Sequence, residues 1–427
     1  VSELRVCQHL YMYFIYMYRL ERSQESFDMT AALSQKTVDI VKSTVPALEA
    51  HGVAITRNMY ERLFRDDKIK ALFNQTHHGE TGAQPKALAG AVLAYARNID
   101  NLGHLGTAVE KIAQKHVGLQ ILPEHYPFVA DALLAAIADI LGDAATEEIM
   151  TAWGDAYWSL AGILMGREQT LYRNAAAANG GWSGWRDFVV ADRHIESDVI
   201  TSFLLRPVDG KPIAAHKPGQ YLTFLIERPG DMSQRRNYSI SAAPNGESYR
   251  ISVKREPGGV VSGWLHEKAV PGTILKVAPP AGEFFLPVDQ TRPVVLLSGG
   301  VGLTPMVAML ESLAKRSPAT PVHFIHGALD GSVHAMADHV RSLGQQTGAH
   351  LQIFYETPRL TDRNYDAEGR IPVTWLLENT PIREADYFIC GPTAFLHCFV
   401  TGLRGAGVAQ DRIHYESFGP GADLMAA

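Results

Sequence analysis

The chain has 427 residues, which gives room for about three domains of ordinary size and disfavours a single compact domain. Its 45 acidic and 39 basic side chains give a net charge of -6, which argues against nucleic acid as a partner. The three cysteines, Cys7, Cys390 and Cys398, are too few for a disulfide framework or for the thiolate ligands of an iron–sulfur cluster. We therefore expect a cytoplasmic protein whose electron carriers have no cysteine ligands.

Residues 1–28 form an unusual first segment. Their apolar run, 10–18, is much shorter than the roughly 20 residues that span a bilayer. Charged residues at 19–22 follow it, where a signal peptide would have small residues at a cleavage site. A clean amphipathic pattern begins at Met29, so we predict that residues 1–28 are an upstream extension that the native protein lacks.

Residues 29–173 have the pattern of an all-helical domain. Apolar residues repeat at helical spacing with few β-branched runs, and glycines such as Gly52 and Gly142 suggest breaks between helices. The alanine- and glycine-rich residues 174–181 lose this pattern, which predicts a linker.

Residues 182–288 change to short alternating runs, such as 221–226, separated by Pro-Gly and Gly-Gly turns. This pattern predicts an antiparallel β-barrel. In residues 289–427, apolar runs that fit buried strands alternate with amphipathic stretches, which predicts a parallel doubly wound sheet. The predicted fold class is therefore multidomain: an all-α domain, an antiparallel barrel and an α/β domain.

Two motifs of the barrel region suit a flavin dinucleotide. The tetrapeptide 236–239, Arg-Asn-Tyr-Ser, offers a fork of donors for a phosphate, an aromatic face for a flat ring and a hydroxyl. Gly258 and Gly259 precede a helix-like stretch, 263–268, whose first backbone amides could bind a pyrophosphate. The alternative for the tetrapeptide alone is an exposed strand with a surface arginine.

Two further motifs suit a nicotinamide nucleotide. The glycine-rich loop 299–305 stands between the strand-like run 293–298 and an amphipathic stretch, 306–315, as in nucleotide-binding α/β folds. Cys390-Gly391-Pro392 ends a later strand-like run at the same expected carboxyl edge, where ligands of such sheets bind. The alternatives are a plain tight turn for the first motif and an ordinary turn with a buried thiol for the second.

Three polar side chains of the helical region lie on apolar helix faces: His116, Tyr60 and Gln84. Buried polar groups need partners, and one haem would satisfy all three. His116 would bind the iron, while Tyr60 and Gln84 would hydrogen-bond a ligand on the other side. The alternative for His116 alone is a core histidine with protein partners.

These motifs together resemble known families. Residues 182–427 resemble the ferredoxin reductase family, and the chain from Met29 resembles a flavohaemoglobin, which is a globin fused to a flavin and nicotinamide reductase. The resemblance implies haem b, FAD, and NADH or NADPH as cofactors. The sequence does not choose between NADH and NADPH.

The resemblance also implies the positions of site residues. On the haem side these contact the porphyrin, its ligand or the ligating histidine: Phe73, Leu88, Tyr126 and Glu168. At the flavin they are Tyr221, Arg236, Asn237, Tyr238, Ser239, Glu416, Ser417, Phe418, Gly419 and Pro420. At the nicotinamide nucleotide they are Gly300, Val301, Gly302, Leu303, Thr304 and Pro305. Lys115 is expected to face Glu416 across the gap between haem and flavin, and an ordinary surface lysine is the alternative.

The activity that the resemblance implies is nitric oxide dioxygenase, which oxidises nitric oxide to nitrate with O2 and NAD(P)H for detoxification under nitrosative stress. One alternative is a general NAD(P)H-dependent reductase of quinones, ferric chelates or nitrite, in which the flavin does the chemistry. Another is a sensor of oxygen or nitric oxide with a lipid-binding haem pocket, and a lipid in that pocket stays an open question. We expect O2 and nitric oxide as substrates, and no obligate protein partner.

Overall fold

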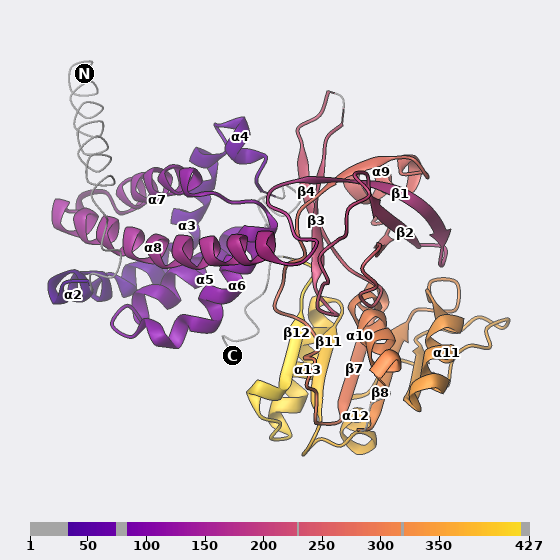
Figure 1. The fold of residues 1–427 in the computed structure, drawn as a ribbon. Helices are drawn as coiled ribbons and strands as arrows, with labels where there is room; N and C mark the ends of the chain where they lie inside the picture. The colour runs from indigo at the N-terminus through magenta and orange to yellow at the C-terminus, as the bar shows by residue number, and fades with distance from the viewer. Residues whose placement is uncertain (1–32, 74–82, 229, 317–319, 420–427) are drawn as a thin grey trace.

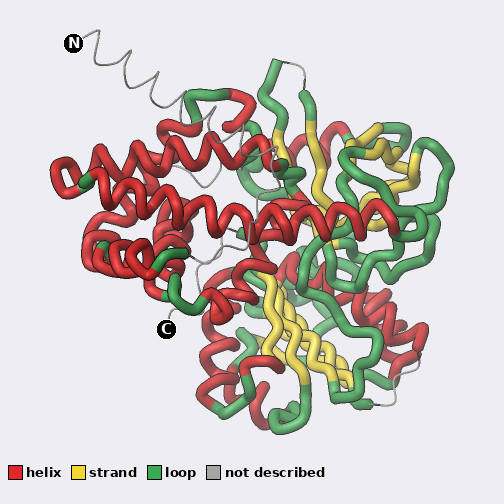
Figure 2. Tube along the Cα trace, turned by 60° about the vertical axis from the view of Figure 1, so that its left-hand side comes forward, coloured by secondary structure: helices red, strands yellow, loops and turns green. Residues whose placement is uncertain are grey.

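The computed structural model describes residues 33–73, 83–228, 230–316 and 320–419, so the predicted extension 1–28 lies outside the described residues. Figure 1 shows three bodies in chain order: a group of helices, an antiparallel sheet and a parallel sheet with helices around it. Figure 2 shows the same division by secondary structure, with most of the helices gathered on one side and the strands on the other. The predicted multidomain fold class is confirmed.

The first body is all-helical and packs around a large apolar core and a smaller second cluster. Its core side chains include Ile55, Met59, Ile137 and Trp153, each at most 3% exposed. Its helices are α2 (Gln35–Ser43), α3 (Val45–Leu63), α4 (Asp67–Lys70), α5 (Ala83–Arg97), α6 (Gly106–Gly118), α7 (Tyr126–Leu141) and α8 (Glu147–Ala177). Within the described ranges, no helix is both long and apolar enough to cross a membrane.

Two helix boundaries differ from the sequence-based expectation. Gly52 is a buried residue inside α3 and not at a break, and a Cβ at this position would lie 3.6 Å from the Ala89 Cβ, in ordinary van der Waals contact with α5. Helix α8 continues to Ala177, past the expected end at Arg173, so residues 174–177 of the predicted linker are helical. Alanine is the best helix former, so the loss of apolar periodicity does not end the helix.

The second body is the expected antiparallel barrel. Its strands are β1 (Arg186–Ile195), β2 (Ile200–Pro207), β3 (Tyr221–Ile226), β4 (Gln234–Ser239), β5 (Tyr249–Lys254) and β6 (Ile274–Val277). They pair in the order β4-β3-β6-β1-β2-β5, and a bridge between Ile240 and Ile251 joins the two ends of this order. Phe188, Phe203 and Leu222 fill the interior with no exposed surface. Helix α9 (Val260–Lys268) starts three residues before the expected stretch, directly after Gly259.

The third body is the expected parallel sheet. Its strands are β7 (Val294–Gly299), β8 (Val322–Ala328), β9 (His350–Tyr355), β10 (Ala367–Glu368), β11 (Asp386–Cys390) and β12 (Ile413–Glu416), in the order β10-β9-β8-β7-β11-β12. Its helices are α10 (Leu303–Arg316), α11 (Ala337–Thr347), α12 (Val373–Asn379) and α13 (Thr393–Gly405). All pairs are parallel, and every residue of β7 is buried, as a central strand covered on both faces requires.

Candidate functional site

Helices α6, α7 and α8 bring His116, Tyr126 and Glu168 together. Glu168 Oε1 accepts hydrogen bonds from His116 Nδ1 at 2.7 Å and from the Tyr126 hydroxyl at 2.6 Å. Because Nδ1 carries the donated proton, the lone pair of the imidazole is on Nε2, as iron ligation requires. The donor set therefore fits the haem iron that the resemblance implies.

Burial keeps the hydroxyl of Tyr126 in this group protonated. The alternative for Glu168, from sequence alone, is a charge at a helix end that reaches water, but Glu168 is only 2% exposed. Burial raises the pKa of Tyr126 far above its usual value of 10, and the Glu168 carboxylate raises it further. Tyr126 is therefore a permanent hydrogen-bond donor to Glu168 at neutral pH.

Tyr60 and Gln84 form a second polar pair, on α3 and α5. Tyr60 is 7% exposed and hydrogen-bonds with the Gln84 side chain. Its ring lies 5.7 Å from the ring of Phe73, centroid to centroid, and Leu88 packs against the same apolar cluster. Burial raises the pKa of Tyr60 to about 12, although the bond with Gln84 acts in the opposite direction. The pair offers a protonated phenol in an apolar setting.

Strands β3 and β4 place the predicted flavin residues opposite one another. Tyr221 is paired with Ser239 in the strand register, and Thr223 Oγ1 donates to Asn237 Oδ1 at 2.9 Å. The Arg236 guanidinium is partly buried, and burial lowers its pKa from the usual 12.5. A partly buried guanidinium two positions before Tyr238 on the same strand suits a phosphate and a flat ring system.

The carboxyl edge of the parallel sheet brings the glycine-rich loop and Cys390-Gly391-Pro392 together. A Cβ on Gly302 would lie 2.2 Å from the Cys390 carbonyl oxygen, so only glycine permits this contact. Gly300 has a φ of +55°, in the left-handed region that favours glycine. Gly300 and Val301 reach the surface of the loop, whereas four of the predicted residues are buried and shape it from behind: Gly302, Leu303, Thr304 and Pro305.

The last strand joins the same edge. Glu416 of β12 is in register with Cys390 of β11 and is followed by Ser417, Phe418 and Gly419, whereas Pro420 lies outside the described residues. Burial raises the pKa of Glu416, and the charge of Lys115 on α6 lowers it. Burial lowers the pKa of Lys115, and the charge of Glu416 raises it. The two side chains therefore influence each other across the junction of helical body and sheet.

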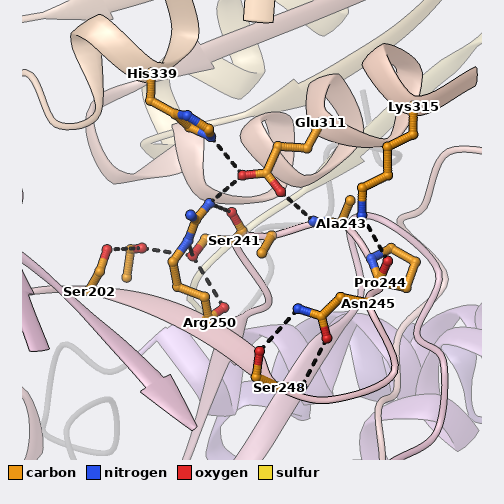
Figure 3. Close-up of polar contacts among 12 residues, drawn as sticks. Ser202, Ser241, Ala243, Pro244, Asn245, Ser248, Arg250, Glu311, Lys315 and His339 are labelled. Atoms are coloured by element: carbon orange, nitrogen blue, oxygen red, sulfur yellow. Dashed lines mark hydrogen bonds and ion pairs between the residues drawn. The ribbon is translucent and has the colours of Figure 1, made fainter. Parts of the chain in front are cut away.

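One group that sequence reasoning missed joins the barrel to the α/β body. Glu311 of α10 bonds Arg250 of β5 at 2.7 Å, His339 of α11 at 2.7 Å and the Ala243 amide at 2.7 Å (Figure 3). Figure 3 also shows Lys315 of α10, which donates to the Pro244 carbonyl oxygen at 3.0 Å. In sequence these residues only mark the polar faces of a strand and two helices, and no motif identifies them.

Comparison with known proteins identifies two parts of the chain. Residues 57–164 match the globin family model, and residues 296–401 match the model of an oxidoreductase NAD-binding domain. The flavohemoprotein of Xylella fastidiosa strain 9a5c is 51% identical over 401 residues, which cover 93% of this chain and 100% of that relative. Both parts of the present chain therefore occur together in a full-length relative.

Solved structures agree with this result. The flavohemoglobin of Malassezia yamatoensis, crystallised with bound FAD and heme, is 26% identical, with a TM-score of 0.81 over 91% of this chain and 100% of that chain. The flavohem-like FAD/NAD-binding domain of nitric oxide dioxygenase from Vibrio cholerae is 39% identical, with a TM-score of 0.52 over 55% of this chain and 99% of that chain. The resemblance seen in the motifs is thus confirmed, and this chain is an oxidoreductase that belongs to the flavohaemoprotein family.

Proposed function

We propose that this flavohaemoprotein is a nitric oxide dioxygenase. Two nitric oxide molecules, two O2 and one NAD(P)H give two nitrate ions, NAD(P)+ and one proton. The observation that carries the proposal is the bonded group of His116, Glu168 and Tyr126 in a chain that also has a nucleotide-binding reductase. The similarity of the reductase half to a domain of a Vibrio cholerae nitric oxide dioxygenase supports the same reaction.

Haem b and FAD, when bound, supply O2 binding and the conversion of a hydride into single electrons. His116 would bind the iron through Nε2 while Glu168 holds the Nδ1 proton. A carboxylate acceptor makes an imidazole a stronger electron donor, which favours the activation of O2. Tyr60 would donate a hydrogen bond to the ligand, because a pKa of about 12 keeps its hydroxyl protonated.

The reductase residues would bind and orient the electron donors. Arg236 would hold a phosphate of FAD, with Tyr221 and Tyr238 against its flat ring, and the loop that begins at Gly300 would receive the nicotinamide nucleotide. Lys115 and Glu416 would lie between the two cofactors. We infer that either NADH or NADPH serves as donor, and that the protein detoxifies nitric oxide in the cytoplasm.

The first test is an absorption spectrum of the purified full-length protein before and after NADH is added under carbon monoxide. We expect the flavin to bleach and a ferrous carbonyl Soret band to appear. In a separate sample without carbon monoxide, added nitric oxide and O2 should yield two nitrate ions for each NADH oxidised. Flavin bleaching without the haem band, in protein that contains haem, would contradict the proposal and support a general flavin reductase.

His116→Ala is the variant that separates these two functions. It should lose the haem band and the consumption of nitric oxide, and it should retain NADH-dependent reduction of ferricyanide through the flavin. Consumption of nitric oxide at the wild-type rate in this variant would show that His116 does not have the assigned role.

A further inference from the structure

Helix α6 has two faces that meet different parts of the molecule. His116 lies on the apolar face, which packs within the helical body. The opposite face carries residues spaced i, i+3, i+4 and i+7: Lys111, Gln114, Lys115 and Gly118. Figure 1 shows α6 on the side of the helical body that lies nearest to strands β3 and β12. This second face is therefore the one that meets the reductase.

The second face packs directly on strands of both reductase bodies. The Lys111 ammonium lies 5.4 Å from the centroid of the Tyr415 ring on β12. A Cβ on Gly118 would lie 3.0 Å from Thr223 Oγ1 and 3.1 Å from the Tyr221 ring on β3. A side chain at position 118 would therefore require the side chains of Thr223 and Tyr221 to shift by a few tenths of an ångström, so glycine suits this close contact.

Gln114 makes the central polar contacts of this junction. Its Oε1 accepts the amide hydrogen of Gly282 at 3.2 Å, and its main-chain oxygen accepts the Tyr221 hydroxyl at 3.4 Å. Its Nε2 donates to Glu110 Oε1 at 3.0 Å, and Arg167 NH2 of α8 donates to the same oxygen at 2.8 Å. Glu110 of the helical body thus orients the Gln114 side chain, and Gly282 of the reductase donates a hydrogen bond to it.

The Gly282 peptide is held from two sides. Gln220 of the barrel donates to its carbonyl oxygen at 3.1 Å, while Gln114 of the helical body accepts from its amide. Gly282 has a φ of +112°, and a Cβ there would lie 2.9 Å from the Tyr221 ring. The contacts of Gln114 therefore end on two residues that touch each other: Tyr221, which is a predicted flavin residue, and Gly282.

The geometry points to Gln114 as a positioning residue that fixes the iron-binding helix α6 against Tyr221 and Gly282. This inference rests on the proposed function, in which electrons pass from the flavin to the haem. Gln114 acts through the placement of α6 and does not itself take part in the chemistry. The rate of electron transfer falls as the distance between donor and acceptor grows, so a looser junction between α6 and β3 should slow internal electron transfer.

The test uses the full-length holoprotein and two variants. Gln114→Met keeps the length of the side chain but cannot form the bonds to Gly282 and Glu110, and Gln169→Met changes an exposed glutamine on α8 as the control. Stopped-flow absorption separates flavin bleaching by NADH from the haem reduction that follows it. We expect flavin bleaching to be unchanged and haem reduction to be slower by about threefold or more in Gln114→Met alone.

A second measurement does not depend on electron transfer. Hydrogen exchange in a peptide that spans residues 278–286 reports the opening of the Gly282 amide, and it should be about two- to tenfold faster in Gln114→Met. Wild-type exchange together with wild-type haem reduction in this variant would overturn the inference. If the wild-type haem itself is not reduced, the proposed function fails, and the exchange comparison still decides whether Gln114 holds the junction.

Discussion

Tyr60 is the residue whose hydroxyl should determine how long O2 stays in the haem pocket. Its pKa of about 12 makes it a donor at neutral pH. A hydrogen bond to the partly negative O2 is worth about 1.5 to 3 kcal/mol, which corresponds to a factor of about ten or more in dissociation. We predict that Tyr60→Phe speeds O2 release about tenfold or more, as measured by stopped-flow absorption after reduction.

Tyr95→Phe is the matched control for this experiment. Tyr95 is also buried and has its pKa raised to about 12 by burial, but its hydroxyl donates to the Ala156 carbonyl oxygen at 2.7 Å. Its removal should leave the rate of O2 release close to that of the wild type. Equal rates in Tyr60→Phe and Tyr95→Phe would exclude the role assigned to Tyr60.

Sequence patterns could single out some of these residues and not others. Polar tips on apolar helix faces identified His116, Tyr60 and Gln84, since helical periodicity is a local property of the chain. Glu168 also ends an apolar helix face, but the roles of Tyr126 and Glu168 came only from the family resemblance, because no spacing rule connects other helices with His116. Their hydrogen bonds exist only once three helices have packed.

At the scale of elements, helix α10 joins the glycine-rich loop to the barrel through Glu311. Burial alone would raise the pKa of Glu311, but hydrogen bonds from His339 and Ala243 and the charge of Arg250 outweigh it and hold the pKa below 4.5. An acid whose pKa is lower in the folded protein than in the unfolded chain stabilises the fold at pH values above the unfolded pKa. This contribution is lost as the pH falls through the folded pKa. Acid should therefore weaken this connection below about pH 4.5.

We predict that Glu311→Gln destabilises the reductase by about 1 to 3 kcal/mol at pH 7, since the Arg250 guanidinium loses a charged partner. Thermal unfolding should show the difference from wild type at pH 7 and a smaller difference below about pH 4.5. Glu267→Gln is the control, because its bond to Arg255 is exposed and such pairs contribute little. A difference between Glu311→Gln and wild type that stays constant down to pH 3 would contradict this account.

Element types followed from local patterns, whereas contacts between elements did not. The glycine-rich loop could be placed between a strand and a helix because each has its own periodicity. Glu311 and Arg250 are 61 positions apart, and each lies on a polar face that looks like an ordinary solvated surface. The end of α8 was also missed, because alanines extend a helix without any amphipathic signal.

At the scale of the whole molecule, buried histidines make the reductase sensitive to mild acid. Burial lowers the pKa of His216, in the barrel, and of His334, in the α/β body, from 6.5 to about 4. Between these two values the unfolded chain binds a proton at each position and the folded protein does not, so stability falls as the pH is lowered from 6.5 to 4. Each of the two histidines should lower the free energy of unfolding by about 1.4 kcal/mol for each pH unit in this window.

In the variant His216→Gln, unfolding in this pH window should take up one proton fewer than in the wild type. Glutamine can still donate to the Ala242 carbonyl oxygen, which His216 Nε2 contacts at 2.8 Å. Urea unfolding at several pH values between 4.5 and 7 should give a shallower slope for this variant than for wild type. His194→Gln, which changes an exposed histidine, should keep the wild-type slope, and identical slopes in all three proteins would refute the prediction.

The order of the three bodies could be predicted, because periodicity changes from helical to alternating and then to mixed along the chain. The contacts at their junction could not be predicted from periodicity, and only the pairing of Lys115 with Glu416 came from the family resemblance. The polar and small residues on the second face of α6 have the spacing of a helix that faces solvent, and only the fold shows that Gln114 and Gly118 face the barrel.

Strand β12 lies at the edge of the parallel sheet and follows every other described strand along the chain. A ribosome therefore completes the helical body and the barrel before it makes the residues that cover the flank of β11. Domains made first generally fold first, so the globin can form while the reductase still has an open edge. Translation order thus allows the helical body and the barrel to fold before the parallel sheet is complete, and a chain that stops before β12 would leave the flank of β11 uncovered.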